Sequence, residues 1–489
     1  MPNEKMKGAF VRMNQLEKVG HLTPKSASEI SVSRIGIGFE KLDRGLFDPT
    51  LAYDKLGQIG AKWARLQSGW QRTERIRGQY DFAWLDAIVD ALRARGMQPW
   101  ICLCYGNDLY NPEAENVFGA VGVPPIFTAA QRQAWAAYVQ ATVAHFRDRV
   151  DHWEIWNEPD GTWCWKHGPN AAEYGRFCAD TAAAIRAAQP DATVIGGAVC
   201  KFSASLAYTD TALAAGMADA IDVLSYHAYS PNETAIAEPV RALRALLRAY
   251  NPRIRVMQGE TGSQSRDDGH GALAGAAWTP MRQAKQCLRH AVLDLAMGME
   301  LTSYFSCVDM AEALGGRNDD LRSRTDYGYF GLLETEFDEN GIASGGYRPK
   351  PAYYAYRNLC AAFAEDPAQS DLPILRIVAP SRRMQGHDFD GAVQMHGFRR
   401  ADGAAALAYW HPANLLTTDF ESTVSFRVTH MTGELRVIDL LHGDVYAVPD
   451  SMIEQEDGEL TLRGLPVTDY PLLLTIGNFA ECERDGQRA

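Results

Sequence analysis

Short apolar runs and amphipathic stretches alternate along the chain from about residue 33 to residue 364. The short runs are rich in β-branched and aromatic residues, whereas the stretches between them repeat apolar residues at helical spacing, as the series from Phe82 to Leu92 does. Such alternation is typical of βα units that build a parallel sheet. Strands are expected near residues 34–39, 62–66, 99–104, 152–157, 193–197, 222–227, 254–260 and 301–306.

A strand followed by a helix, repeated through this region, predicts a (β/α)₈ TIM barrel of the α/β class. Helices are expected over residues 82–95, 131–149, 171–188 and 351–363. The alternative is a doubly wound open sheet, which needs a glycine-rich phosphate turn after its first strand. The stretch from Gly36 to Lys41 lacks the third glycine of such a turn, so the barrel is favoured.

Beyond residue 365 the apolar period changes to two. Val424, Phe426 and Val428 alternate with polar neighbours, as in a strand with one buried face. This pattern predicts a C-terminal antiparallel β-sandwich, while the first residues have no clear place and could lend a strand to it. We expect an N-terminal extension over residues 1–32, a catalytic barrel over 33–364 and a β-sandwich accessory domain over 365–489.

Composition and charge narrow the class of ligand. The chain is 46% hydrophobic and 22% charged, as folded globular proteins are, and its net charge of −13 disfavours nucleic acid as a partner. No run of about 18 apolar residues is present, so no membrane partner is expected. The start, Met1 to Arg34, lacks the apolar core of a secretory signal, which favours a cytoplasmic location unless the chain has been trimmed.

The nine cysteines are scattered and odd in number, so they predict neither a disulfide framework nor a zinc site. Several, such as Cys102 and Cys104, lie in strand-like runs where a thiol packs as a small apolar group. We expect no metal. The oligomeric state is left open, and a homo-oligomer is compatible with the sequence.

Two glutamates stand where a barrel places its catalytic groups, at the carboxyl ends of strands. Glu158 follows the expected fourth strand and Glu260 ends the expected seventh. Strands four and seven lie across the mouth of an eight-stranded barrel, so the two carboxylates can face each other. Retaining hydrolysis of a glycoside needs such a pair about 5–5.5 Å apart, with one group protonated and the other ionised.

The run Trp156-Asn157-Glu158-Pro159 resembles the strand-four signature of clan A glycoside hydrolases, and Gly259-Glu260-Thr261-Gly262 resembles their strand-seven site. Within the clan the chain is most similar to family 39, the β-xylosidase-like group, in the stretches Gly38-Phe39-Glu40, Trp63-Ala64-Arg65-Leu66, Tyr80-Asp81-Phe82 and Lys350-Pro351-Ala352-Tyr353-Tyr354. The resemblance implies a retaining mechanism with Glu158 as acid/base and Glu260 as nucleophile. It also implies no metal and no organic cofactor.

Other residues at the same end of the barrel are candidates for holding a sugar. The resemblance implies that Asn157 contacts the 2-hydroxyl and that His227 or Tyr229 touches the nucleophile. Arg65 could keep Glu260 ionised, although each of these residues could also be a structural contact. The remaining candidates are Glu40 and Asn107 for hydroxyl groups, and Trp70, Trp163, Trp165, Trp278 and Tyr304 for stacking on sugar rings.

We therefore expect a retaining β-glycosidase whose partner is a carbohydrate substrate. β-Xylosides come first among the expected substrates, followed by other β-pentosides, β-galactosides and β-glucosides. The long insertion between Asn107 and Phe127 favours exo action. The alternatives are a sugar-binding barrel without catalysis and an endo-acting or transglycosylating enzyme of the same clan.

Overall fold

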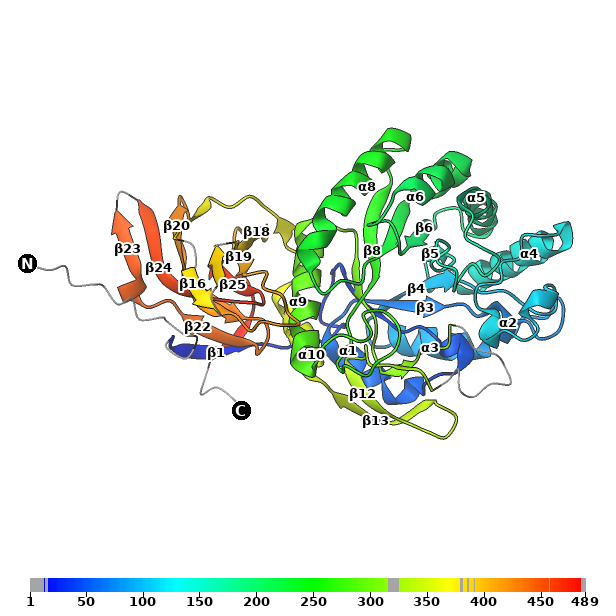
Figure 1. Ribbon diagram of the computed structural model, residues 1–489, viewed down its shortest axis with the longest axis horizontal. Helices are drawn as coiled ribbons and strands as arrows, with labels where there is room; N and C mark the ends of the chain where they lie inside the picture. Colours follow the sequence, from blue (N-terminus) through cyan, green and yellow to red (C-terminus); the bar gives the residue numbers. More distant parts are fainter. Residues whose placement is uncertain are drawn as a thin grey trace, which may run out of the picture.

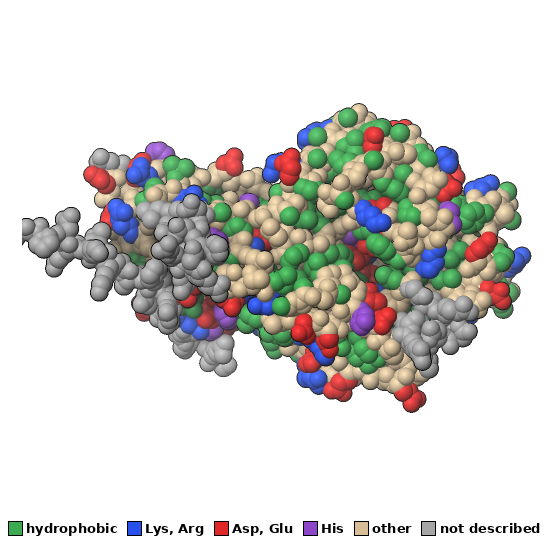
Figure 2. Space-filling model, in the orientation of Figure 1, with side chains coloured by type: hydrophobic (Ala, Val, Ile, Leu, Met, Phe, Trp, Pro, Cys, Tyr) green, Lys and Arg blue, Asp and Glu red, His purple; other side chains and the backbone are tan. Residues whose placement is uncertain are grey.

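The computed structural model describes residues 13, 16–314, 325–378, 381–384, 387–390, 392–456 and 458–484. Residues 1–12 and 485–489, at the ends of the predicted extension and sandwich, lie outside the described residues. Figure 1 shows a ring of strands surrounded by helices and, beside it, a part built mainly of β-strands. Acidic and basic side chains are interspersed over the face shown in Figure 2.

Parallel strands close into the predicted TIM barrel, because each pairs with the next and the last pairs with the first, with Ile35 opposite Thr302. Each strand begins within two residues of an expected start, and the predicted fold class is confirmed. The barrel strands are β2 (Ile35–Gly38), β3 (Trp63–Gln67), β4 (Gln98–Leu103), β5 (His152–Ile155), β6 (Thr193–Val199), β7 (Val223–His227), β8 (Arg255–Thr261) and β9 (Thr302–Tyr304).

The helices cover the outside of the barrel with their apolar faces. α3 (Ala83–Arg93) buries the predicted stripe of Leu85, Ile88, Val89 and Leu92. The other helices are α1 (Tyr53–Ile59), α2 (Trp70–Thr73), α4 (Ala129–Phe146), α5 (Ala171–Ala188), α6 (Ala207–Ala212), α7 (Ala218–Ala220), α8 (Ala237–Tyr250), α9 (Pro280–Ala296) and α10 (Pro351–Ala362). None of the helices in the described part of the chain combines the length and apolarity that crossing a membrane requires.

The amino-terminal end of the barrel is filled by a small apolar cluster, here called the apolar plug. Its members come from the first residues of six strands or just before them, and they pack apart from the main core. They leave room of only about 30 Å³ between them. The plug consists of Trp63, Trp100, Ile195, Val223, Met257 and Leu301.

The C-terminal part contains two antiparallel sheets. The larger has the order β14-β18-β19-β25-β21-β22-β1-β26, and the smaller the order β15-β20-β24-β23. β1 (Lys18–Leu22) pairs with β22 on one side and with β26 on the other, so a strand from the start of the chain lies inside this sheet. The other strands of the larger sheet are β14 (Ala368–Gln369), β18 (Gln394–Arg399), β19 (Ala405–Trp410), β21 (Leu435–Asp439), β22 (Asp444–Ala447), β25 (Leu472–Ile476) and β26 (Cys482–Arg484).

The smaller sheet is made of β15 (Ile374–Val378), β20 (Glu421–Thr429), β23 (Ile453–Glu456) and β24 (Glu459–Thr468). Hairpins account for the remaining strands, β10 (Met310–Ala311), β11 (Tyr327–Gly328), β12 (Leu333–Phe337), β13 (Ala343–Pro349), β16 (Ser381–Met384) and β17 (His387–Asp390).

α9 and α10 lie between the barrel strands and the β-rich part (Figure 1). Lys285 of α9 reaches Asp469 at 2.9 Å, and Trp410 of β19 donates its indole N–H to Glu233 at 2.8 Å. Arg289 pairs with the same Glu233 at 2.6 Å, and all three members of this contact are buried. Paired buried charges therefore join the two parts of the molecule.

Candidate active site

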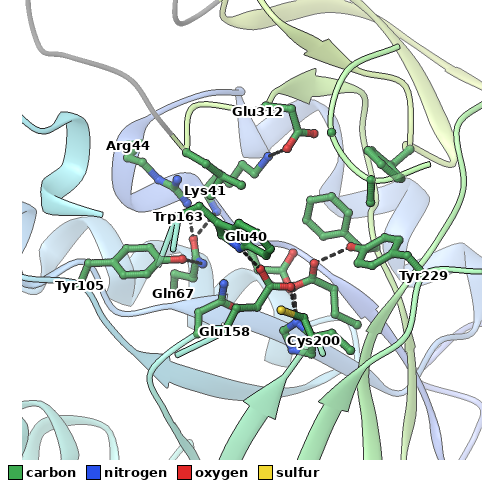
Figure 3. Close-up of a pocket in the computed structure, with 18 of the residues that line it drawn as sticks. Glu40, Lys41, Arg44, Gln67, Tyr105, Glu158, Trp163, Cys200, Tyr229 and Glu312 are labelled. Atoms are coloured by element: carbon green, nitrogen blue, oxygen red, sulfur yellow. Dashed lines mark hydrogen bonds and ion pairs between the residues drawn. The ribbon is translucent and has the colours of Figure 1, made fainter. Parts of the chain in front are cut away.

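A cavity of about 490 Å³ opens at the carboxyl ends of the barrel strands. Glu158 and Glu260 both line it. Figure 3 shows Glu158 with Tyr229 and Trp163, which also line the cavity. Glu158 lies three residues beyond the end of β5, the fourth barrel strand, and Glu260 lies near the end of β8, the seventh. The fold therefore brings these carboxylates, about a hundred residues apart in sequence, to one cavity.

His227, at the end of β7, lies between the two carboxylates. Its Nδ1 is 3.0 Å from Oε1 of Glu158 and 3.6 Å from Oε2 of Glu260. One carboxylate oxygen of each glutamate and one ring nitrogen of His227 all lie within 4.8 Å of one another. The separation is close to that of retaining glycosidases and shorter than the roughly 6.5–9.5 Å of inverting ones.

Glu260 is held by two donors. Arg65 donates to Oε2 at 2.7 Å, as expected from the sequence, and the Tyr229 hydroxyl donates to Oε1 at 2.5 Å. Burial by itself raises the pKa of Glu260, but the charges of His227 and Arg65 outweigh burial, and the net pKa is lowered. Burial also raises the pKa of Tyr229 well above its usual value, so its hydroxyl stays a donor. Glu260 is therefore ionised at neutral pH.

Glu158 has different partners. The indole N–H of Trp163 donates to its Oε2, and His227 contacts its other oxygen. Lys201, which follows β6, lies over the Trp163 ring at 5.2 Å from the ring centroid. Burial lowers the pKa of His227, but the charge of Glu260 and the hydrogen bond to Glu158 outweigh it, so the pKa is raised.

Arg65 is the centre of the charge network beneath the cavity. It is fully buried and also contacts Glu154 at 2.7 Å and Glu40 at 3.2 Å. Its remaining nitrogen donates to Oδ1 of Asn157 at 2.9 Å, which fixes the residue next to Glu158. Burial raises the pKa of Glu40 to about 7, and its Oε2 has no hydrogen-bond partner in the described structure.

By spacing alone, Glu158, His227 and Glu260 could hold a metal ion. Their donor atoms are already in contact with cationic or N–H groups, since Arg65 lies 2.7 Å from Glu260 and Trp163 donates to Glu158. A divalent cation placed there would meet the positive charge of Arg65. The donor set therefore does not fit a resident metal.

Two residues predicted to bind substrate lie behind the strand ends instead. The Trp70 indole is fully buried, donates to Glu74 at 2.6 Å and stacks on Tyr110. Asn107 is also buried and donates to the Glu74 carbonyl at 2.9 Å. Neither lines the cavity, because Trp70 opens the short helix α2 and packs on Tyr110, while Asn107 is held by the backbone that follows α2.

Three more of the predicted substrate contacts are wrong, because these aromatic side chains point away from the cavity. Trp165 is fully buried against Trp156, and Trp278 donates to the Leu273 carbonyl beneath its own loop. Tyr304 points outward and donates to the Ser263 carbonyl, whereas its neighbour Phe305 lines the cavity. Adjacent strand residues face opposite sides, so only one of that pair can reach a substrate.

The cavity also contains residues that the sequence interpretation missed. Lys41 and Arg44 follow Glu40 after β2, Gln67 ends β3, and Tyr105 follows β4. Their positions after strands were a usable signal, because the same rule identified Glu40. Glu312, in the loop after β10, carried no comparable signal.

Residues 63–246 match the family model described as Glycosyl hydrolases family 39. A Beta-xylosidase from Geobacillus stearothermophilus is 29% identical over 217 residues, which cover 41% of this chain and 42% of that protein. The Beta-galactosidase BgaA of Clostridium cellulovorans is 30% identical over 149 residues, or 27% of this chain and 22% of that protein. The chain thus spans less than half the length of these curated relatives.

A solved structure of a family 39 glycoside hydrolase from the gut symbiont Bacteroides cellulosilyticus WH2 resembles the whole molecule. The TM-score is 0.64 at 18% identity, over 93% of this chain and 83% of that one. At this identity the likeness speaks for the fold, a barrel with an appended β-rich part. With the family model matched across five of the barrel strands, the similarity of this chain to glycoside hydrolase family 39 is confirmed.

Proposed function

We propose that the protein is a retaining β-glycosidase that releases a terminal sugar, with β-xylosides as the first candidate substrates. The observation that carries the proposal is the pair Glu158 and Glu260, whose nearest carboxylate oxygens lie within 4.8 Å at the mouth of the barrel. Their partners differ: Glu260 accepts from Arg65 and Tyr229, and Glu158 accepts from Trp163.

In the first step, Glu158 gives its proton to the glycosidic oxygen while the Glu260 carboxylate attacks the anomeric carbon. The glycosidic bond breaks, the aglycone leaves as an alcohol, and a glycosyl ester of Glu260 forms. In the second step, Glu158 takes a proton from water, whose oxygen attacks the anomeric carbon and displaces Glu260. Two inversions restore the original anomeric configuration.

The substrate proposal rests on the cavity and on the relatives. A volume of about 490 Å³ lies in the range of small-molecule sites, and Phe305, Phe330 and Tyr105 give it aromatic walls that suit sugar rings. Ala272, after β8, and Leu314, after β10, also line the cavity, so loops after these strands help to form a pocket, which favours exo action. The curated relatives are named as a β-xylosidase and a β-galactosidase, so both aryl glycosides belong in the first assays.

Azide separates the roles of the two glutamates. Glu260→Ala should lose nearly all hydrolysis of an aryl β-xyloside and, with azide, give the glycosyl azide of inverted configuration. Glu158→Ala is the matched control and should give the azide of retained configuration, because azide then attacks the intact glycosyl ester. Wild-type turnover by Glu260→Ala contradicts the proposal.

A further inference from the structure

One wall of the cavity, here called the charged wall, carries buried ionic groups that the catalytic steps do not use. It consists of Lys41, Arg44 and Glu312 (Figure 3). The Arg44 side chain is 1% exposed, and its NH1 has no hydrogen-bond partner in the described structure. Oε1 of Glu312 is also buried without such a partner. A buried donor and a buried acceptor without partners, on two residues that line the same cavity, point to a ligand that completes them.

The segment after β2 holds Arg44 firmly in place. Its NH2 donates to Oε1 of Gln67 at 2.6 Å, its Nε is 3.3 Å from Asp43, and the guanidinium lies 5.5 Å from the centroid of the Tyr105 ring. Gln67 also accepts from the backbone N–H of Lys41. These three contacts fix the guanidinium of Arg44, so NH1 is already in position to donate. A ligand can therefore accept this hydrogen bond without the entropy cost of ordering a long side chain.

The charged wall offers both signs of charge. Lys41 donates to the Ala311 carbonyl at 3.1 Å and lies 3.8 Å from Oε2 of Glu312. Arg44 has Asp43 beside it. A carboxylate, sulfate or phosphate group could accept from Arg44 but would also lie close to these acids. A neutral hydroxyl group both donates and accepts, so it satisfies the open donor and the open acceptors together.

In Figure 3, Arg44 and Glu312 lie apart from Glu158, with Glu40 and Lys41 between them. Glu158 and Glu260 act at the anomeric carbon in the proposed reaction. Groups displaced from that pair would contact hydroxyls farther round the ring. The open oxygen of Glu40 lies between the two regions and would accept from a hydroxyl nearer the anomeric carbon.

We propose that Arg44 is a specificity-determining residue that, with Glu312, binds ring hydroxyls of a neutral terminal sugar and disfavours acidic ones. This inference rests on the proposed function and names the substrate class of that site. Within the charged wall, Lys41 stabilises the Glu312 carboxylate by its positive charge.

The test is a double-mutant cycle between Arg44→Gln and substrates that each lack one ring hydroxyl. On aryl β-xyloside, Arg44→Gln should lower kcat/KM by about 10- to 100-fold, the value of a hydrogen bond to a charged group. For one monodeoxy analogue, the kcat/KM of the wild type should fall by a similar factor, whereas the kcat/KM of Arg44→Gln should hardly fall further. If every analogue lowers the kcat/KM of both proteins by the same factor, Arg44 contacts no hydroxyl and the proposal is wrong.

Arg72→Gln is the matched control. Arg72 donates to the Leu42 carbonyl of the same segment and lies over Trp84, but it does not line the cavity. The Arg72→Gln substitution should change stability, but every deoxy analogue should lower the kcat/KM of this variant by the same factor as that of the wild type. Because the cycle compares ratios measured on the same preparation, a partly unfolded Arg44→Gln still gives a decisive answer.

A second arm tests the rejection of acidic sugars. The wild type should hydrolyse an aryl β-glucuronide with a kcat/KM at least about 100-fold below that of the matching β-glucoside, because the sugar carboxylate would meet the like charge of Glu312 in the charged wall. Glu312→Gln should narrow this gap. Equal or faster hydrolysis of the glucuronide overturns the proposal.

If no glycoside is hydrolysed at all, the proposed function fails and binding alone decides the inference. Calorimetric titration should then show weaker binding of free xylose by Arg44→Gln than by Arg72→Gln. Equal affinities would overturn the inference.

Discussion

The two ends of the barrel are built from the same strands but carry opposite chemistry. At the amino-terminal end, the apolar plug leaves about 30 Å³ of free space. At the carboxyl end, a cavity of about 490 Å³ is lined by Arg44, Glu158 and Glu260, above the buried Arg65. Burial of apolar area stabilises the first end, whereas buried charges at the second can persist only because each has a partner. Stability and activity should therefore respond separately to substitutions at the two ends.

The largest effect is expected for Arg65→Met. Removing the guanidinium leaves Glu40, Glu154 and Glu260 close together without their shared partner, which should cost about 3–5 kcal/mol of unfolding free energy. Activity should fall with it, because Glu260 loses a group that keeps it ionised. Denaturant unfolding and kcat/KM measure both effects.

Arg255→Met is the control at the other end. Arg255 forms an exposed pair with Glu300 at the start of β8, so its loss should hardly change the midpoint of unfolding. Equal destabilisation by the two substitutions would remove the distinction between the ends.

Met257→Ala should separate stability from activity. Met257 belongs to the apolar plug and is 2% exposed, so truncation should cost about 2–5 kcal/mol. The kcat of the folded protein should stay within about twofold, because the site lies about three strand residues away along β8. A tenfold loss of kcat in fully folded protein would show that the plug positions the catalytic groups.

Tyr229→Phe should do the reverse. It removes the hydrogen bond to Oε1 of Glu260 and should lower kcat by about 10- to 100-fold with little change in stability. Tyr353→Phe is the matched control, since that hydroxyl donates to the Lys55 carbonyl on the outside of the barrel. Similar kcat values for the two variants would exclude a role for the Tyr229 hydroxyl.

The smallest effect is a change in pH dependence. Glu260 must be ionised to attack, and its pKa is lowered from the ordinary 4.5, mainly by His227 and Arg65 against the opposing effect of burial. The acid limb of kcat/KM should therefore lie below pH 4.5, and the stability that ionised Glu260 contributes should be lost as pH falls through its lowered pKa. Tyr229→Phe should move this limb upward. An acid limb above pH 4.5 in the wild type would contradict the lowered pKa.

The barrel strands could be predicted because a strand that is covered on both faces appears in the sequence as a short apolar run, such as Trp100 to Cys104. The position of Glu158 and Glu260 at strand ends followed from the same reading. The direction in which a side chain points after the end of a strand could not be predicted from these apolar runs. Trp70 and Trp163 both come shortly after strands, yet one packs into the helix layer and the other contacts Glu158.

The charged wall illustrates a second limit of sequence reading. Charged residues in a loop are ordinarily solvent-exposed, so Lys41 and Arg44 gave no sign of burial. Only the folded chain shows that Gln67 and Glu312, from distant segments, cover them. Single-sequence patterns describe neighbours along the chain, and the charged wall is made by neighbours in space.

The place of β1 between β22 and β26 has a consequence for biosynthesis. The first of these strands leaves the ribosome about 420 residues before its partners. At a synthesis rate of about 5–20 residues per second, it waits on the order of 20–80 seconds while the barrel is being made. A recombinant chain begun at residue 33 would lack this strand and leave β22 with an open edge that invites aggregation. An expression boundary upstream of Lys18 avoids that edge.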